Sequence, residues 1–189
     1  DIPLGLHWHH FNQPILPPTV PDCIKTSETV EDKILVYLPF ENTDSVLKLL
    51  KQIQGFRFFV YANYEKEEIS GNVHIRPFSR ENFVKDLSEC YGVICNSGFS
   101  MISEALHIGK KVLTKPLQGQ NEQESNALAL EELGLGTVVE ELNVKDIEKW
   151  LKTPKPEPMN FPNVIEPVVD WISEGDWNNR QELIRKVWG

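Results

Sequence analysis

The sequence predicts an α/β domain in which a mainly parallel sheet of six strands carries helices on both faces. Short apolar runs of strand length alternate with segments in which apolar residues recur at helical spacing, and this order is typical of parallel sheets. Most of the 13 prolines lie near the two ends of the chain and bracket the alternating segments. With 189 residues, of which 40% are hydrophobic, the chain is long enough to bury a sizeable core.

The first predicted strand covers residues 33–38, an apolar run that suits a buried strand. A helix should follow, because Asn42 or Thr43 offers a cap, an apolar face recurs at helical spacing, and Gly55 offers a stop. Further strands are expected at residues 56–61, 72–76, 92–96, 111–114 and 136–140, and further helices at residues 80–89, 100–108, 122–133 and 144–151. Connections that contain a helix are long enough for the right-handed crossovers that join parallel strands.

The two ends of the chain differ from this body. Residues 1–32 are Pro-rich and are expected to form an interdomain linker, residues 33–152 the α/β domain, and residues 153–189 a Pro-rich connection with a helical arm. Helical patterns at residues 168–173 and 178–187 predict the arm. Four of the five tryptophans lie in the last forty residues, and we expect them to anchor the arm on the sheet by packing.

Composition and charge exclude several classes of protein. The 19 Lys and Arg against 28 Asp and Glu give a net charge of −9 without a basic run, so no nucleic acid partner is expected. No apolar run has the length of a transmembrane segment, and the N-terminus lacks the features of a signal peptide. The 3 cysteines show no C-x-x-C spacing, which favours a reduced, cytoplasmic chain. Because it does not begin with Met, we expect a piece of a longer protein.

Polar segments follow the predicted strands, at the edge where parallel sheets bind ligands. The clearest is Asn96-Ser97-Gly98, which precedes a helix that begins near Ser100. Unpaired backbone N–H groups and the positive end of the helix dipole would meet there and form a phosphate cradle. Glu104, one turn further on a solvent-facing rim, has a carboxylate that could accept two hydrogen bonds from a ribose diol. An ordinary tight turn, with Glu104 complementing the helix dipole, explains these residues equally well.

A second polar segment opens the helix expected at residues 122–133. Gln123 and Asn126 are three residues apart and therefore lie on one face of that helix. Their amides combine donors with acceptors, as recognition of sugar hydroxyls requires. Solvated polar side chains on a first helical turn are the alternative interpretation.

Three motifs, in this order, carry a resemblance to a known family. They are H-I-x-P-F from His74, S-G-x-x-x-x-S-E-A from Ser97 and E-Q-x-x-N-A from Glu122. Residues 34–151 thereby resemble the carboxy-terminal, donor-binding half of GT-B glycosyltransferases, which have two facing Rossmann-like domains, and are most similar to glycosyltransferase family 28. The resemblance implies a Rossmann-like three-layer α/β/α domain for the body of the chain.

The resemblance also implies a ligand and its contacts. The ligand would be a nucleotide sugar, most often a uridine diphosphate (UDP) sugar, bound without metal or other cofactor. The implied contacts are Phe78 and Ser79 for the base, Ser97, Gly98, Phe99, Ser100 and Met101 for the diphosphate, Glu104 for the ribose, and Gln123 and Asn126 for the sugar hydroxyls. Gln120 is a further expected contact of the nucleotide sugar.

The implied reaction passes a hexosyl group to the hydroxyl of a glycan, a lipid or a small molecule. The general base is expected on a separate amino-terminal domain that binds the acceptor, so no catalytic residue is assigned here. This fragment alone should therefore be inactive. A lipid acceptor would place the protein at the membrane surface.

One departure and two absences refine this interpretation. The first predicted strand runs into residues 38–42 (Leu-Pro-Phe-Glu-Asn) instead of a glycine-rich loop, so a phosphate contact from that loop does not follow from the resemblance. No Asp-x-Asp occurs, which suits a transferase that stabilises its leaving diphosphate with a helix N-terminus. No G-x-G-x-x-G or P-loop motif occurs, which disfavours dehydrogenases and P-loop nucleotidases.

Several alternatives stay open at this point. A nucleotide-sugar epimerase shares the fold, and a non-catalytic binding module could keep it. His7, His9 and His10 invite a metal site, but no carboxylate or Cys completes a local set, so packing of a linker near the interdomain cleft is the preferred interpretation. Cys90 and Cys95 flank a predicted strand and are expected in the core.

Overall fold

The computed structural model describes residues 2–175 and 177–189, and a seven-stranded sheet forms its centre. The strand order is β5-β6-β4-β3-β7-β8-β9, and every pair is parallel except the edge pair β5-β6. The strands are β3 (Val30–Tyr37), β4 (Arg57–Ala62), β5 (Glu68–Ser70), β6 (Val73–Pro77), β7 (Cys90–Asn96), β8 (Lys111–Lys115) and β9 (Thr137–Val138). The predicted mainly parallel α/β fold is confirmed, and β5 is an additional strand.

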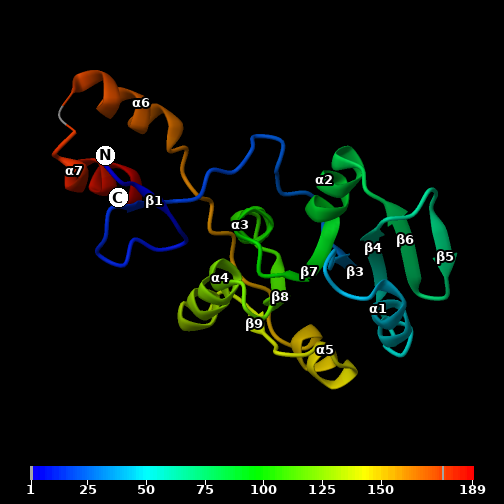
Figure 1. Ribbon diagram of the computed structural model, residues 1–189. Helices are drawn as coiled ribbons and strands as arrows, with labels where there is room; N and C mark the ends of the chain where they lie inside the picture. Colours follow the sequence, from blue (N-terminus) through cyan, green and yellow to red (C-terminus); the bar gives the residue numbers. More distant parts are fainter. Residues whose placement is uncertain (1, 176) are drawn as a thin grey trace.

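Five helices cover the two faces of the sheet. They are α1 (Thr43–Leu50), α2 (Arg80–Glu89), α3 (Phe99–His107), α4 (Asn121–Glu132) and α5 (Val144–Leu151). One buried apolar cluster joins the sheet to α2, α3 and α4, and a second joins its other face to α1 and α5. Figure 1 shows α2 and α3 on one side of the strands and α1 and α5 on the other. Leu35 belongs to the first cluster and its neighbours Ile34 and Val36 to the second, as the period of two in a strand requires.

The order in which the chain adds strands to the sheet reverses between the central, parallel strands β3 and β7. From β3 the chain proceeds through β4 to β6 on one side, and from β7 through β8 to β9 on the other. Ligands of open parallel sheets bind at such a switch point, outside the carboxyl ends of the strands. This edge of the sheet is therefore where the candidate residues must be sought.

The two chain ends form a small lobe beside the sheet. Figure 1 shows both termini in this lobe, next to β1 and α7. The lobe contains the parallel pair β1 (Gly5–Leu6) and β2 (Ile15–Leu16) and the helices α6 (Ile165–Glu174) and α7 (Arg180–Trp188). Leu16 packs against Leu183, Ile184 and Val187, and the indole of Trp188 donates a hydrogen bond to the carbonyl of Ile15 at 2.9 Å. The predicted helical arm is confirmed, and residues from the Pro-rich first segment complete its core.

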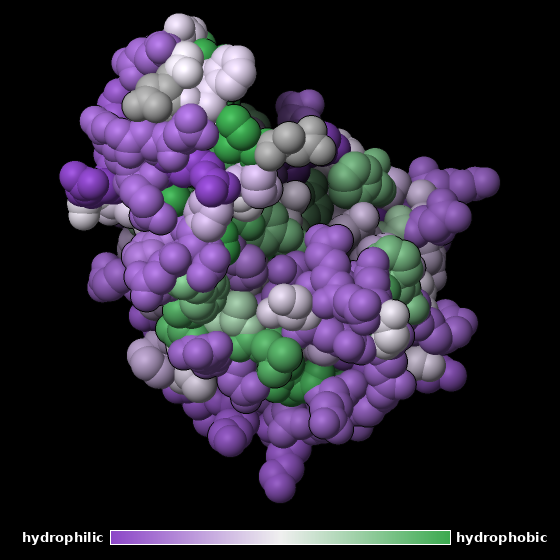
Figure 2. All heavy atoms as spheres, turned by 60° about the vertical axis from the view of Figure 1, so that its left-hand side comes forward, coloured by the Kyte–Doolittle hydropathy of each residue, from purple (hydrophilic) through white to green (hydrophobic). Residues whose placement is uncertain are grey.

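Three of the four carboxy-terminal tryptophans pack as predicted, but the expected anchoring of the arm on the sheet is wrong, because its packed tryptophans lie in the core of the lobe. Trp150 is buried beneath the sheet, and Trp171 and Trp188 pack against the core of the lobe. Trp177 is 48% exposed, so the packing interpretation is wrong for this residue. Hydrophilic residues cover most of the face shown in Figure 2, with smaller hydrophobic patches between them.

Cys90 and Cys95 are buried in the core, as expected. Their thiols are free, and burial raises the pKa of both to about 12. Both side chains are therefore protonated core residues at neutral pH.

Candidate functional site

The turn between β7 and α3, where the sequence predicts a phosphate cradle, begins α3 without a side-chain cap. Gly98 is the N-cap of α3 and supplies no side-chain hydrogen bond, so the first N–H groups of the helix have no side-chain cap. A Cβ atom at Gly98 would meet nothing within 4 Å, and its φ of −73° suits any residue. The packing of the protein itself therefore does not require glycine at this position, and space is left above the helix N-terminus.

The side chains of α4 hold this turn in place. Gln123 Oε1 accepts hydrogen bonds from the backbone N–H of Ser97 at 3.1 Å and of Leu117 at 3.2 Å. Asn126 Nδ2 donates to the carbonyl of Ser97 at 2.9 Å. The Ser97 hydroxyl lies 2.9 Å from the hydroxyl of Thr114, and Ser97 is fully buried. The amides expected at the sugar thus also position the turn, which sequence reasoning missed.

Glu104 lies in the second turn of α3 and is only 7% exposed. The expected solvent-facing position of its side chain was therefore wrong, because Arg80 at the start of α2 covers it. Arg80 Nη2 lies 2.8 Å from Glu104 Oε1, and Nη1 lies 3.4 Å from Oε2. The hydrogen bond with Glu104 raises the pKa of Arg80. A carboxylate has about four acceptor positions, so this fork leaves two for hydroxyl donors.

Phe78 and Ser79 lie where β6 passes into α2. The Ser79 hydroxyl caps α2 by accepting from the N–H of Asn82 at 3.4 Å, and the Phe78 side chain is exposed. Phe78 borders a pocket of about 440 Å³ at the carboxyl ends of β3, β4 and β6. Tyr37 and Tyr61 contribute to its wall, and their ring centroids lie 6.0 and 6.3 Å from that of Phe78. The sequence analysis did not predict this pocket, although the aromatic residues near the ends of the strands could have indicated it.

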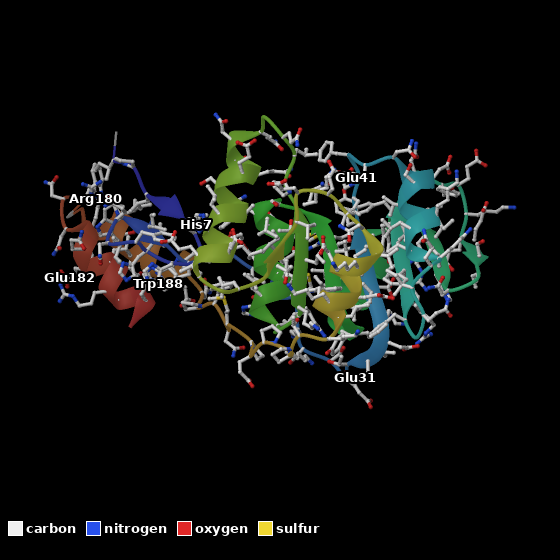
Figure 3. All side chains as sticks on the ribbon, turned by 90° about the horizontal axis from the view of Figure 1, so that it is seen from below. His7, Glu31, Glu41, Arg180, Glu182 and Trp188 are labelled. Atoms are coloured by element: carbon white, nitrogen blue, oxygen red, sulfur yellow. The ribbon has the colours of Figure 1, made fainter. Side chains whose placement is uncertain are left out.

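A polar cluster formed by Glu41, Asn96 and Lys115 lies at the carboxyl ends of the central strands. Lys115 Nζ is 2.8 Å from Glu41 Oε2, and both side chains are largely buried. Asn96 Nδ2 donates to the carbonyl of Lys115 at 3.1 Å and lies 3.4 Å from Glu41 Oε1. The hydrogen bond with Glu41 raises the pKa of Lys115. Figure 3 shows Glu41 and Glu31 at opposite ends of β3.

The amino-terminal segment packs on the start of α3. The Trp8 ring stacks on Phe99 with 5.5 Å between centroids, and its indole donates to the hydroxyl of Ser103 at 2.8 Å. The His7 ring lies 5.6 Å from that of Phe99, and burial lowers the pKa of His7. This segment therefore shields one side of the cradle.

The remaining predicted contacts and histidines have simple surroundings. Ser100 and Gln120 are exposed, and Met101 packs at the margin of the core. His9 and His10 each accept a backbone hydrogen bond through Nδ1, from the N–H groups of Phe11 and Asn12. Only the Nε2 atom of each ring is therefore left as a possible metal ligand.

Many Rossmann-like domains have a doubly wound sheet with an open helix N-terminus at its switch point, and the carboxy-terminal half of GT-B glycosyltransferases is one of them. A family model described as glycosyl transferase family 1 matches residues 10–154, and the chain belongs to this family. An uncharacterized glycosyltransferase of Methanosarcina acetivorans is 42% identical over 62 residues, which are 31% of this chain and 16% of that protein. The resemblance to GT-B glycosyltransferases is thereby confirmed, although the matching model is described as family 1 and not as family 28, which the sequence motifs had favoured.

Solved glycosyltransferases share the fold. The glycosyltransferase SnogD from Streptomyces nogalater has a TM-score of 0.50 and 17% identity, with 79% of this chain and 41% of that chain covered. The spinosyn forosaminyltransferase SpnP has a TM-score of 0.50 and 15% identity, with coverage of 90% and 43%. The glycotransferase of kitacinnamycin has a TM-score of 0.51 and 14% identity, with coverage of 94% and 44%. The chain thus spans less than half of each of these proteins.

The helices can also be compared with what a bilayer requires. Within residues 2–175 and 177–189, none combines the length and apolar character needed to cross a membrane.

Proposed function

We propose that this chain binds a nucleoside diphosphate sugar, with uridine as the nucleoside, and forms the donor-binding part of a glycosyltransferase. The observation that carries the proposal is the open N-terminus of α3, which lies beside a nearly buried carboxylate, Glu104, with acceptor positions to spare. A diphosphate suits the helix N-terminus, and a ribose diol suits the carboxylate. The aromatic pocket beside Phe78 lies next to the expected base position.

In this proposal the protein stabilises the leaving group. The bond between the anomeric carbon of a hexosyl group and the diphosphate oxygen breaks, and its electron pair remains on that oxygen. Backbone N–H groups at the start of α3 stabilise the developing charge without a metal ion. The acceptor hydroxyl bonds to the anomeric carbon, and a base on another domain takes its proton.

Gln123 and Asn126 have two tasks in this proposal. The hydrogen bonds to the Ser97 turn use Gln123 Oε1 and Asn126 Nδ2. The other polar atom of each amide is left for hydroxyl groups of the sugar. Loss of either side chain would therefore affect the cradle as well as the sugar contact.

Titration calorimetry tests the proposal directly. The chain should bind UDP, and should bind UDP-hexoses. The affinity for each ligand should be the same in magnesium as in a chelator, and the chain should release no sugar on its own. Metal-dependent binding, or failure to bind any of a panel of nucleoside diphosphates, would contradict the proposal. Conversion of the bound sugar into its epimer would favour the epimerase.

A further inference from the structure

The polar cluster of Glu41, Asn96 and Lys115 brings together the carboxyl ends of three neighbouring strands. Glu41 follows β3, Asn96 ends β7 and Lys115 ends β8, so the cluster lies at the switch point, beside the turn that begins α3. The segment 38–42 contains no glycine, and its Leu38, Glu41 and Asn42 line a pocket together with Lys115. We propose that Lys115 binds the sugar-bearing phosphate of the donor, an inference that rests on the proposed function.

The ammonium group of Lys115 is fixed in place and keeps donors for a ligand. Glu41 takes one hydrogen bond at 2.8 Å, whereas Glu141 lies 3.6 Å away and is 76% exposed. An ammonium has three N–H donors, so at least one remains for an anion. Because the side chain is only 14% exposed, little freedom is lost when a phosphate binds.

The net charge of the whole chain favours a local cation at the site. The net charge is −9, so a diphosphate approaches against an unfavourable field unless positive charge is placed at the site. Arg80 is directed toward Glu104 through two contacts, on the side of the expected ribose. Lys115 belongs to the cluster at the switch point and keeps a donor there for a phosphate.

Asn96 supplies an independent indication of a polar ligand. The residue is 6% exposed, and among the described residues its Oδ1 has no hydrogen-bond partner. A buried acceptor without a partner is costly, and the hydroxyl of a sugar would satisfy it. A ligand with a phosphate next to hydroxyl groups thus completes both halves of the cluster.

The proposed contact has a defined chemical task. When the bond from the anomeric carbon breaks, the electron pair remains on the phosphate oxygen, and the Lys115 ammonium offsets the added negative charge without transferring a proton. The start of α3 and Lys115 would then hold the diphosphate from two sides. Such fixed charges require no reorganisation during the reaction.

The test compares UDP with UMP, which lacks the second phosphate. We expect Lys115→Met to weaken UDP binding about tenfold or more, the loss of one charge-assisted bond, and to leave UMP binding unchanged. Because this change strands the Glu41 carboxylate, the fold is protected in a double variant, Glu41→Gln with Lys115→Met, which should show the same selective loss. Glu41→Gln alone keeps the ammonium and should bind UDP at least as tightly as the unchanged chain.

Arg57→Met is the matched control, because Arg57 forms an ion pair with Asp32 at 2.7 Å. Arg57 is the first residue of β4, so this pair lies at the amino ends of the strands, away from the proposed site. This control should bind UDP and UMP as the unchanged chain does. Wild-type UDP affinity in the double variant, or equal weakening toward UDP and UMP, would overturn the Lys115 contact alone. If the unchanged chain binds neither nucleotide, the proposed function fails and the inference fails with it.

Discussion

At the scale of single residues, Glu104 and Lys115 are two partly neutralised charges with different expected partners. Glu104 forms an ion pair with Arg80 beside the expected ribose position, whereas Lys115 forms an ion pair with Glu41 beside the expected phosphate position. Each residue is ordered by an ion pair and each keeps hydrogen-bonding capacity. Pre-ordering of this kind lowers the entropic cost of binding, so both side chains serve recognition more than stability.

Glu104→Gln should therefore weaken UDP and UMP equally, because both nucleotides carry the ribose. We expect about a tenfold loss, since a neutral amide accepts weaker hydrogen bonds than a carboxylate. Calorimetry with both nucleotides checks the equality, which sets this variant apart from Lys115→Met. The melting temperature should change little, because the amide keeps the size of the carboxylate and the Arg80 side chain, which is 50% exposed, can be solvated by water. An unchanged affinity in the folded variant would remove Glu104 from the site.

At the scale of secondary-structure elements, α4 acts as the support of the cradle. Its Gln123 bonds two loop N–H groups, from the turns after β7 and after β8, and so ties two strand ends together. The helix itself has no side-chain cap at Gln120 and packs through Ala127 and Leu130. The position of the Ser97 turn thus depends on tertiary hydrogen bonds more than on local sequence.

Gln123→Ala should consequently lower stability and also weaken UDP binding. Two N–H groups would lose their acceptor, and each buried unsatisfied group costs about 1–3 kcal/mol. Chemical denaturation measures the first effect and calorimetry the second, with Glu122→Ala as the control because Glu122 is an exposed neighbour on the same turn. Full stability in Gln123→Ala would show that water replaces the lost bonds and that α4 does not support the turn.

The sequence predicted these elements well where the pattern was long and periodic. The six parallel strands and the five helices of the body are each found within a few residues of their expected positions. The sequence analysis did not predict strand β5, which forms a hairpin with β6, although Gly71, with a φ of +65°, lies in the tight turn between them. Strands β1 and β2 have two residues each, too few to show a period.

The site was less predictable, because its contacts join residues far apart in the chain. Glu41 and Lys115 are 74 positions apart, and nothing in either local segment predicts their pairing. Likewise, Arg80 covers Glu104 from a different helix. The motif residues could be placed at one edge of the sheet from the strand pattern, whereas their burial and bonding depend on tertiary packing.

At the scale of the whole molecule, the body and the terminal lobe differ in how firmly they are packed. The sheet lies between two large apolar clusters, whereas the lobe is held by a small cluster around Leu16 and Leu183. Helix α6 has no buried residue, and Ile165, Val169 and Ile172 are each more than half exposed along one side of it. Segments with few buried contacts open at low free energy, independently of global unfolding.

Hydrogen exchange should therefore separate the two parts and locate the ligand at the same time. Amides of β3 and β7 should exchange only through global unfolding, and those of α6 should exchange much faster, because opening α6 exposes little additional apolar surface. Saturating UDP should slow exchange at the start of α3 and throughout the body, since binding stabilises the folded state by mass action. Exchange in α6 should stay unchanged, because its opening does not require the body to open. Protection of α6 equal to that of β3, or a response of α6 to UDP as large as that of α3, would show that lobe and body unfold as one unit.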